Sequence, residues 1–177
     1  MTRIKGFTIV ELVVVIILLG ILAATALPRF IDVDTEAKVA AIKSLHGGIT
    51  TTAAMFHGHA MVHEPNGGLV NGYVTPEGVF MDQGYPLAIS YGDTNGIPEI
   101  FEAMQSSPEQ WTLGEVFNGT GRSTAQRTRE LFITLPSIID APTATAAQIV
   151  ATNCYIEYET YVYVTQAPDI FLETNGC

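Results

Sequence analysis

The hydrophobic positions fall into two patterns, and the first is a nearly unbroken apolar run over residues 7–27. Seventeen of these 21 residues are hydrophobic. As an α-helix the run would be about 31 Å long, close to the thickness of a bilayer's hydrocarbon core. Arg3 and Lys5 precede it, as cytoplasmic positive charges precede membrane helices. The pattern predicts a membrane-spanning helix; the alternative is a secretory signal peptide with a cleavage site at residues 24–26.

A second pattern follows Pro28, where apolar residues recur at steps of three or four and so mark one face of a helix. This stripe comprises Phe30, Val33, Ala37, Ala41, Leu45, Ile49, Ala53 and Phe56. We expect one helix from about residue 7 to near residue 56, whose second half is covered by the rest of the chain. Gly47-Gly48 weakens it, so a bend or an early end there is the alternative.

The remaining residues alternate between turn signals and short strands. Asn-Gly pairs typical of turns occur at Asn66-Gly67-Gly68, Asn71-Gly72, Asn95-Gly96 and Asn118-Gly119. Residues 131–135 form an apolar run that Pro136 stops, and residues 155–164 alternate between two faces. We expect these strands to form an antiparallel sheet on the apolar stripe of the helix. No βαβ rhythm indicates a parallel sheet, so the expected fold class is α+β.

Composition and charge change this picture in one respect. The chain has 177 residues, with 8 Lys+Arg against 18 Asp+Glu and a formal net charge of −10. This balance argues against nucleic-acid binding, which needs basic residues to neutralise phosphates. The chain is nevertheless 47% hydrophobic. Without residues 7–27 the figure falls to about 42%, ordinary for a soluble domain, so the excess belongs to the N-terminal run.

Glu11 is the one charge within the apolar run. A carboxylate at the centre of a membrane helix costs roughly 2.5–3.5 kcal/mol on insertion scales, so it usually has a partner. No Lys, Arg or His lies between Glu11 and Arg29. The nearest cation would be a new amino terminus, made by a cut between Gly6 and Phe7, because an α-amine is mostly protonated at neutral pH. The alternative is a glutamate at the membrane interface that reaches water.

A family resemblance rests on the residues around this glutamate, Lys5-Gly6-Phe7-Thr8-Ile9-Val10-Glu11-Leu12, and on the apolar run to Pro28. They resemble the class III signal and N-terminal helix of type IV pilins. In that family a prepilin peptidase cuts after the glycine, here Gly6, and N-methylates the new first residue, here Phe7. The family's glutamate, here Glu11, neutralises the amine of a neighbouring subunit during filament assembly.

The resemblance also implies the organisation of the chain. It implies a leader peptide at residues 1–6 and a transmembrane and filament-core half of the helix at residues 7–27. The amphipathic half of the helix follows at residues 28–59, and a β-rich head at residues 60–177. Gly20 and Pro28 match family positions where the helix loosens as subunits pack into a filament. Glycine is unfavourable inside a helix and proline removes a hydrogen bond there.

Residues 27–31 and 43–50 are similar to a narrower group, the mannose-sensitive haemagglutinin (MSHA) pilins. This implies a major pilin that serves surface attachment, biofilm formation and, in some members, motility. The implied partners are further copies in a helical homopolymer, the prepilin peptidase, the assembly ATPase, the platform protein, the secretin and host or abiotic surfaces. The implied location is the inner membrane before assembly and an extracellular fimbrium afterwards.

Two alternatives to a major pilin remain open at this stage. A pseudopilin of a type II secretion system, or a minor pilin, shares the N-terminal signal but works in a short periplasmic assembly. A secreted or membrane-tethered binding protein with a conventional signal peptide is of another class. The mature N-terminus and the abundance of extracellular fibres distinguish them.

Cys154 and Cys177 are the only cysteines. A metal site with two thiolates would need further ligands nearby, and none stands at suitable spacing. A disulfide fits better, because the signal places the head outside the cytoplasm. It would contribute roughly 3 kcal/mol in the chain-entropy model. Residues 154–177 resemble the disulfide-bounded region of pilins, which commonly forms exposed surface.

The sequence offers no catalytic arrangement and no cofactor motif, so we expect a protein that is not an enzyme. Residues 119–122 lack the strand, spacing and lysine of a phosphate loop. Four histidines cluster, namely His46, His57, His59 and His63. His59 and His63 would share a helical face at i, i+4 and could bind a metal. The alternative is a polar helix end, and we assign no metal site from the sequence.

Overall fold

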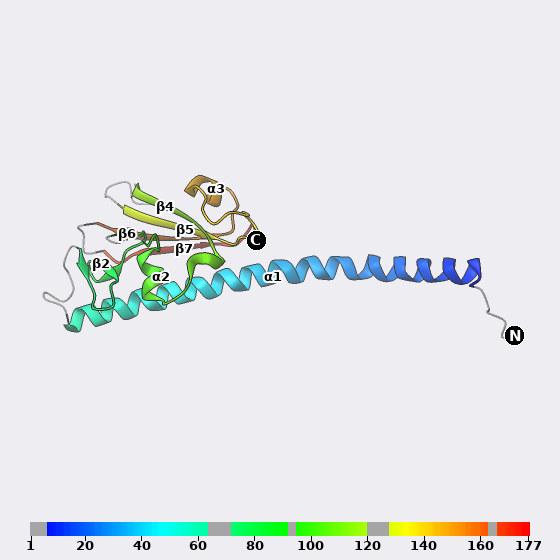
Figure 1. Cartoon of the computed structure of the whole chain (residues 1–177), viewed down its shortest axis with the longest axis horizontal. Helices are drawn as coiled ribbons and strands as arrows, with labels where there is room; N and C mark the ends of the chain where they lie inside the picture. The colour runs from blue at the N-terminus through cyan, green and yellow to red at the C-terminus, as the bar shows by residue number, and fades with distance from the viewer. Residues whose placement is uncertain (1–6, 64–71, 92–94, 120–127, 163–165) are drawn as a thin grey trace. The chain divides into compact units, whose positions relative to one another are not determined.

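The computed structural model describes residues 7–63, 72–91, 95–119, 128–162 and 166–177, with the side chains at 26–32 and 118–119 left outside the description. The chain forms two compact units, Met1–Lys38 and Val39–Cys177. Helix α1 (Ile9–His63) contributes its first part to the first unit and its last part to the second (Figure 1). The predicted turn at residues 66–68 lies outside the described residues.

The second unit is built on two antiparallel sheets. The larger has the order β4-β5-β6-β7. Its strands are β4 (Thr112–Gly119), β5 (Thr128–Thr134), β6 (Tyr155–Tyr161) and β7 (Asp169–Glu173). The smaller has the order β1-β2-β3 and comprises β1 (Tyr73–Val74), β2 (Phe80–Asp82) and β3 (Tyr85–Pro86). Short helices connect them: α2 (Glu99–Ala103), the 3-10 helix η2 (Pro108–Gln110) and α3 (Ala146–Val150).

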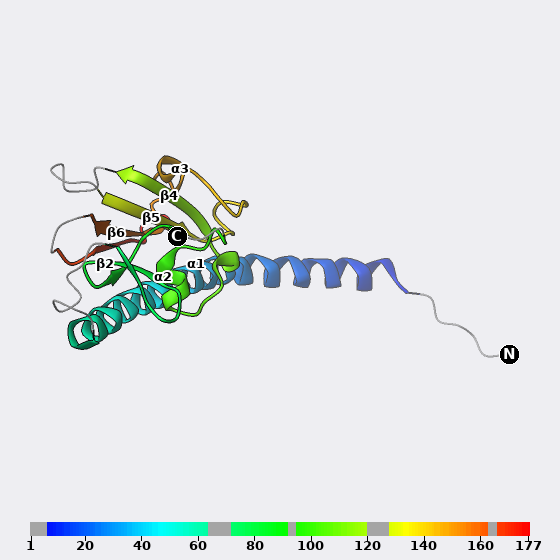
Figure 2. The same ribbon diagram turned by 60° about the vertical axis from the view of Figure 1, so that its left-hand side comes forward.

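The main core lies between the larger sheet and the last part of α1. Helix residues Ile42, Leu45, Ile49 and Ala53 form one cluster with sheet residues Leu131, Ile133, Ile156 and Tyr158 and with Ile100 and Phe101 of α2. Figures 1 and 2 both show α1 along one face of the sheet and α3 on the opposite face. The predicted placement of an antiparallel sheet on the helix is therefore confirmed.

The buried face of α1 agrees only in part with the predicted stripe. Leu45, Ile49 and Ala53 are buried as expected. Val33 is 62% exposed, however, and Ile42 and Ala60, which the stripe did not include, are buried. The predicted stripe advances by four residues at most steps, more than one helical turn, so it drifts around the helix away from the face that the sheet covers.

The end of α1 also differs from the prediction, since the helix passes Gly47 and Gly48 and continues to His63. Each glycine costs up to about 1 kcal/mol in a helix relative to alanine. Burial of the flanking residues Leu45 and Ile49 outweighs this cost, because tertiary packing supplies most of a helix's stability in proteins. A Cβ at Gly48 would lie 2.9 Å from Met104 Cε, so this glycine also lets α1 approach the residues after α2.

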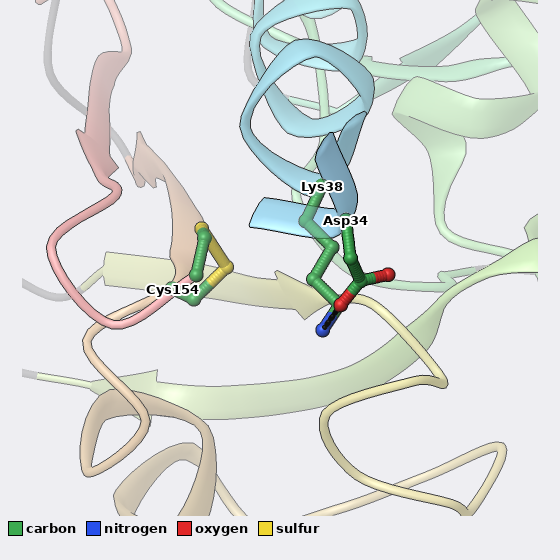
Figure 3. Close-up of polar contacts among 4 residues, drawn as sticks. Asp34, Lys38 and Cys154 are labelled. Atoms are coloured by element: carbon green, nitrogen blue, oxygen red, sulfur yellow. Dashed lines mark ion pairs between the residues drawn. A yellow bond between two sulfur atoms is a disulfide. The ribbon is translucent and has the colours of Figure 1, made fainter. Parts of the chain in front are cut away.

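Along the charged side of α1, Asp34 and Lys38 form an i, i+4 ion pair with 2.5 Å between Oδ2 and Nζ (Figure 3). Asp34 is well exposed, so the pair adds at most a few tenths of a kcal/mol to helix stability. Because both residues lie on α1, the ion pair stabilises only the local helical conformation at the end of the first unit.

Strand β6 is buried on both faces, whereas its alternating sequence predicted an apolar face and a polar face. Ile156 and Tyr158 enter the main core, and Tyr155 packs with Phe132 and Ile149 in a second cluster. The second cluster exists because α3 covers that face. α3 is started by a reciprocal capping box, in which Thr145 and Gln148 each bond the other's backbone N–H.

Two of the four predicted turns lie at glycines with positive φ, Gly72 (+64°) and Gly96 (+72°), a conformation that glycine adopts without strain. The turn predicted at Asn118-Gly119 is wrong. Those residues belong to β4, where the pairing with β5 shifts register between Val116 and Gly119. An irregular strand tolerates the same residues as a turn, since both need a backbone that departs from the regular ladder.

The predicted α+β fold is confirmed, with a long N-terminal helix, antiparallel sheets and a disulfide between Cys154 and Cys177. Over the part of the chain that the structure describes, no helix combines the length and the apolar character needed to cross a membrane.

Candidate assembly site

The first turn of α1 holds Glu11 in a capping box formed with Thr8. Thr8 donates its backbone N–H and its hydroxyl to Glu11 Oε2, at 2.9 and 2.8 Å. In return, Glu11 donates its backbone N–H to Thr8 Oγ at 3.2 Å. The helix begins at Ile9, so Thr8 is the N-cap residue and Glu11 is the third residue of the helix. The carboxylate also lies at the positive end of the helix dipole.

This capping box is a functional feature that the sequence reasoning missed, although its signal, Thr-x-x-Glu ahead of an apolar run, is legible in the sequence. Within the described subunit, Glu11 therefore has a partner on its own helix. The hydroxyl and N–H of Thr8 are neutral donors, so they satisfy hydrogen bonds of the carboxylate but leave its negative charge uncompensated.

The apolar side chains from Ile9 to Leu22, which lie before and after Glu11 in the sequence, are exposed on every side of the helix. Their exposed fractions run from 42% at Val13 to 81% at Ile9. The set comprises Ile9, Val10, Leu12, Val13, Val14, Val15, Ile16, Ile17, Leu18, Leu19, Ile21 and Leu22. Monomeric soluble proteins rarely expose a contiguous apolar surface of this kind, and a helix that is apolar all round is normally buried. The described residues of the first unit therefore leave this apolar surface uncovered.

The remaining predicted residues of this segment are placed as follows. Gly6 lies outside the described residues, and Phe7 is the first residue described, with 80% of its surface exposed. Gly20 lies inside α1 with nothing within 4 Å of the position that a Cβ would occupy. Pro28 lies in the helical backbone of α1, and its side chain lies outside the description.

The disulfide between Cys154 and Cys177 fixes the C-terminus of the chain beside the start of β6 (Figure 3). Gly176 N–H donates to the Asn153 carbonyl at 2.8 Å, and a Cβ on Gly176 would lie 1.9 Å from the carbonyl oxygen of Thr152. Only glycine allows this approach of two backbones. The covalent bond and the close packing together hold the last strand, β7, against the sheet.

A buried carboxylate in the head serves the fold. Glu99 is 1% exposed and accepts hydrogen bonds from Phe80 N–H at 2.7 Å and Tyr91 N–H at 2.9 Å. Burial raises the pKa of Glu99 to about 7, although the two backbone hydrogen bonds oppose that shift. Glu99 thus joins α2 to the smaller sheet, and the side chain of Glu102, a second carboxyl group on α2, raises the pKa of Glu99 further through a hydrogen bond and its charge.

The clustered histidines separate into two environments. The His57 ring stacks on Tyr85 with 4.2 Å between ring centroids, and it is half-buried. The rings of His59 and His63 stack on each other, also at 4.2 Å, on the exposed side of α1. Among the described residues, no group of three or more His, Cys, Asp or Glu is arranged to hold a metal ion.

The similarity of this chain to known proteins covers part of its length. Residues 1–27 match the family model described as the prokaryotic N-terminal methylation motif. The chain is 40% identical over 53 residues to the type IV narrow pilus major component PilA5 of Thermus thermophilus, which is 30% of this chain and 46% of that protein. It is 29% identical over 103 residues to the fimbrial protein EcpC of Eikenella corrodens, 58% of this chain and 64% of that protein.

A third relative, a fimbrial protein of Moraxella nonliquefaciens, is 46% identical over 48 residues, 27% of this chain and 31% of that protein. The chain thus spans less than two thirds of the length of each of these relatives. No solved structure matches it. The methylation motif and the fimbrial relatives support a type IV pilin, and the methylation motif covers the residues that carry Phe7, Glu11 and the exposed apolar surface.

Proposed function

We propose that this chain is a structural subunit of a type IV pilus, a major pilin of the MSHA type, which assembles through the first part of α1. The strongest support is the exposed apolar surface of that segment, 42–81% per residue, which contains one charge, Glu11. Burial against other copies would remove that surface from water, at roughly 25 cal/mol per Å² of apolar area. The relatives named as pilus and fimbrial components support a structural role in place of an enzymatic one.

In this proposal, a prepilin peptidase removes residues 1–6 and methylates the amine of Phe7. The methylated amine stays basic, so it supplies the positive charge that Thr8 cannot give to Glu11. In the filament, the amine of one subunit would pair with Glu11 of its neighbour, in competition with the capping box of the free subunit. The capping bonds already have an ionised acceptor, so what favours the exchange is the opposite charge of the amine, whose attraction to the carboxylate strengthens in apolar surroundings.

The same proposal gives the chain two locations and a set of partners. Residues 7–27 would be held in the inner membrane before assembly, and the filament would be extracellular, with the second units forming its outer surface. The assembly ATPase, the platform protein and the secretin would act on the subunit in turn. The filament would serve surface attachment and biofilm formation, with motility in addition if it retracts.

Mass spectrometry of the mature chain tests the processing. A mature chain that begins at N-methylated Phe7, recovered as the bulk of fibres sheared from cells, is the expected result. A chain that begins at Leu27 would show a conventional signal peptide and overturn the proposal. A methylated Phe7 in a chain that stays in the cell envelope, with no extracellular fibres, would instead assign it to a pseudopilin or a minor pilin.

A further inference from the structure

The last two turns of α1 carry a column of metal-ligating side chains that filament assembly does not use. Met55, His59 and His63 follow one another at intervals of four residues, so they lie on one side of the helix. All three are exposed. Met55 and His59 also line one cavity of about 190 Å³, together with Phe56, Thr75 and Glu77. The column is thus accessible from solvent.

The two imidazoles of this column are already paired. Their ring centroids lie 4.2 Å apart and their planes differ by 13°. Two nitrogens that bind one tetrahedral ion at about 2.0–2.1 Å lie roughly 3.4 Å apart. Because the stacked rings are nearly parallel, binding one ion requires the exposed rings to rotate out of the stack until the lone pair of one nitrogen of each points to it. Two histidines at i, i+4 on a helix are a recurrent metal-binding spacing.

A backbone hydrogen bond prepares His63 for this role. Its Nδ1 lies 3.1 Å from the carbonyl oxygen of His59, and a carbonyl can only accept, so Nδ1 carries the hydrogen. The neutral ring then presents the lone pair of Nε2. Metal-binding histidines typically donate their other ring N–H to a carbonyl or a carboxylate in this way, which fixes the tautomer and the orientation of the ring.

His57 is placed differently, although it stands only two residues from His59. Its ring stacks on Tyr85 within the second unit, at an interplanar angle of 4°. Residues two apart on a helix point in different directions. His57 therefore belongs to the packing of the smaller sheet, and the exposed column contains two imidazoles.

We propose that His59 and His63 chelate a first-row divalent ion at the end of α1, and that Met55 makes copper the preferred metal. Two imidazoles suit copper, nickel and zinc, and affinity for such a site rises from nickel to copper and falls to zinc. A thioether selects copper further, above all Cu⁺. When Met55, His59 and His63 are its protein ligands, a four-coordinate ion keeps one open position, as catalytic sites do and closed structural sites do not.

The test uses the full mature chain in detergent at 0.15 M salt, with excess Mg²⁺ to occupy carboxylates. Cu²⁺ and Zn²⁺ are titrated into wild type, His59→Gln and His63→Gln, with His46→Gln as a matched control on the same helix. Each ligand variant is expected to weaken Cu²⁺ binding at least about tenfold, the lower bound for loss of even an outer-shell partner. The control is expected to bind like wild type.

Electron paramagnetic resonance of the Cu²⁺ complex gives a readout that a folding defect would not mimic. Nitrogen coupling from two imidazoles is expected in wild type and from one in either single variant. Wild-type binding by the His59→Gln/His63→Gln double variant would overturn the proposal, and so would equal loss in His46→Gln. For Met55→Leu we expect weaker Cu⁺ binding with Zn²⁺ binding unchanged; an unchanged Cu⁺ affinity would remove Met55 from the ligand set.

Discussion

The two parts of α1 have the same secondary structure, yet their apolar residues are buried very differently. Between residues 9 and 22 the large apolar side chains are 42–81% exposed, whereas Ile42, Leu45, Ile49 and Ala53 are at most 6% exposed. The difference follows from the pattern, because a stripe on one side can be covered by one sheet, and an apolar surface on all sides cannot. The helix therefore carries one surface for folding and another that the proposed function assigns to association.

This comparison predicts whether a substitution in α1 changes the stability of the subunit or its association with other copies. Loss of a buried side chain in the second part should change the stability of a single subunit. Loss of a side chain in the first part should leave the subunit stable and change only association. Burying a dozen exposed aliphatic side chains contributes on the order of 10–20 kcal/mol per subunit, against which the entropy of association must be set.

Glu11→Ala should have the largest effect on the first part. If Glu11 pairs with the Phe7 amine of a neighbour, its removal leaves a buried amine without a partner, which costs about 3–5 kcal/mol per subunit. We expect processing at Gly6 to continue and sheared filaments to disappear. Glu36→Ala is the matched control, because Glu36 is an exposed glutamate on the same helix, and it should give normal fibres. Abundant fibres from Glu11→Ala would refute the pairing.

Ile49→Ala and Ile16→Ala compare the two surfaces with the same substitution. Ile49 is fully buried in the main core, so its truncation should destabilise the subunit by about 2–5 kcal/mol. Ile16 is 56% exposed, and its truncation should change subunit stability by no more than about 0.5 kcal/mol while reducing filament yield. Urea unfolding in detergent measures the stability of the subunit, and the amount of fibre sheared from cells measures filament yield. Equal loss of stability from the two variants would remove the distinction.

The disulfide supports the covering of the second part, because it holds β7 and the C-terminus on the sheet. Replacing both cysteines, Cys154→Ala/Cys177→Ala, should lower stability by about 3 kcal/mol and the unfolding midpoint by roughly 10 °C. The apolar surface at residues 9–22 should be unaffected, so membrane extraction of the chain should not change. A reducing agent should reproduce the loss in wild type and do nothing further in the double variant. Equal unfolding midpoints for wild type and the double variant would contradict a stabilising role for the disulfide between Cys154 and Cys177.

Much of the fold was predictable because its signals are local. The alternation at residues 155–161, the apolar run before Pro136 and the isolated cysteine pair each specified a strand or a bond that the structure contains. The burial of both faces of β6 was not predictable, since it depends on α3, a helix of only five residues that the sequence pattern did not indicate. The end of α1 was missed because packing around Gly48 outweighs the poor helix propensity of glycine.

The candidate assembly site was predictable to a different degree. Glu11 was singled out because a lone carboxylate in an apolar run is energetically conspicuous. Its capping by Thr8 was missed, although the Thr-x-x-Glu spacing carries that signal. The i, i+4 spacing placed His59 and His63 on one helical face, as the structure has them. The stacking of His57 on Tyr85 was beyond the sequence, because it joins residues 28 positions apart in the chain. Contacts between residues far apart in the chain leave no periodic pattern in the sequence from which they could be predicted.

The smallest expected effects come from alanine substitutions at two glycines of α1, Gly20 in its first part and Gly58 in its second. At each glycine there is open space where a Cβ would stand, so the two substitutions can be compared directly. Alanine is favoured over glycine inside a helix by roughly 0.5–1 kcal/mol, since it restricts the unfolded backbone. Gly58→Ala should therefore raise the free energy of unfolding by about that amount and leave filaments unchanged.

Gly20→Ala should leave the fold of the subunit intact for the same reason, so any further effect must arise between copies. If the helix loosens around Gly20 when subunits pack, alanine should strengthen it there, and sheared filaments should need more force to extend than wild type or Gly58→Ala. Pulling single filaments with an atomic force microscope measures this. Identical extension curves for wild type, Gly20→Ala and Gly58→Ala filaments would show that the helix does not loosen preferentially at Gly20.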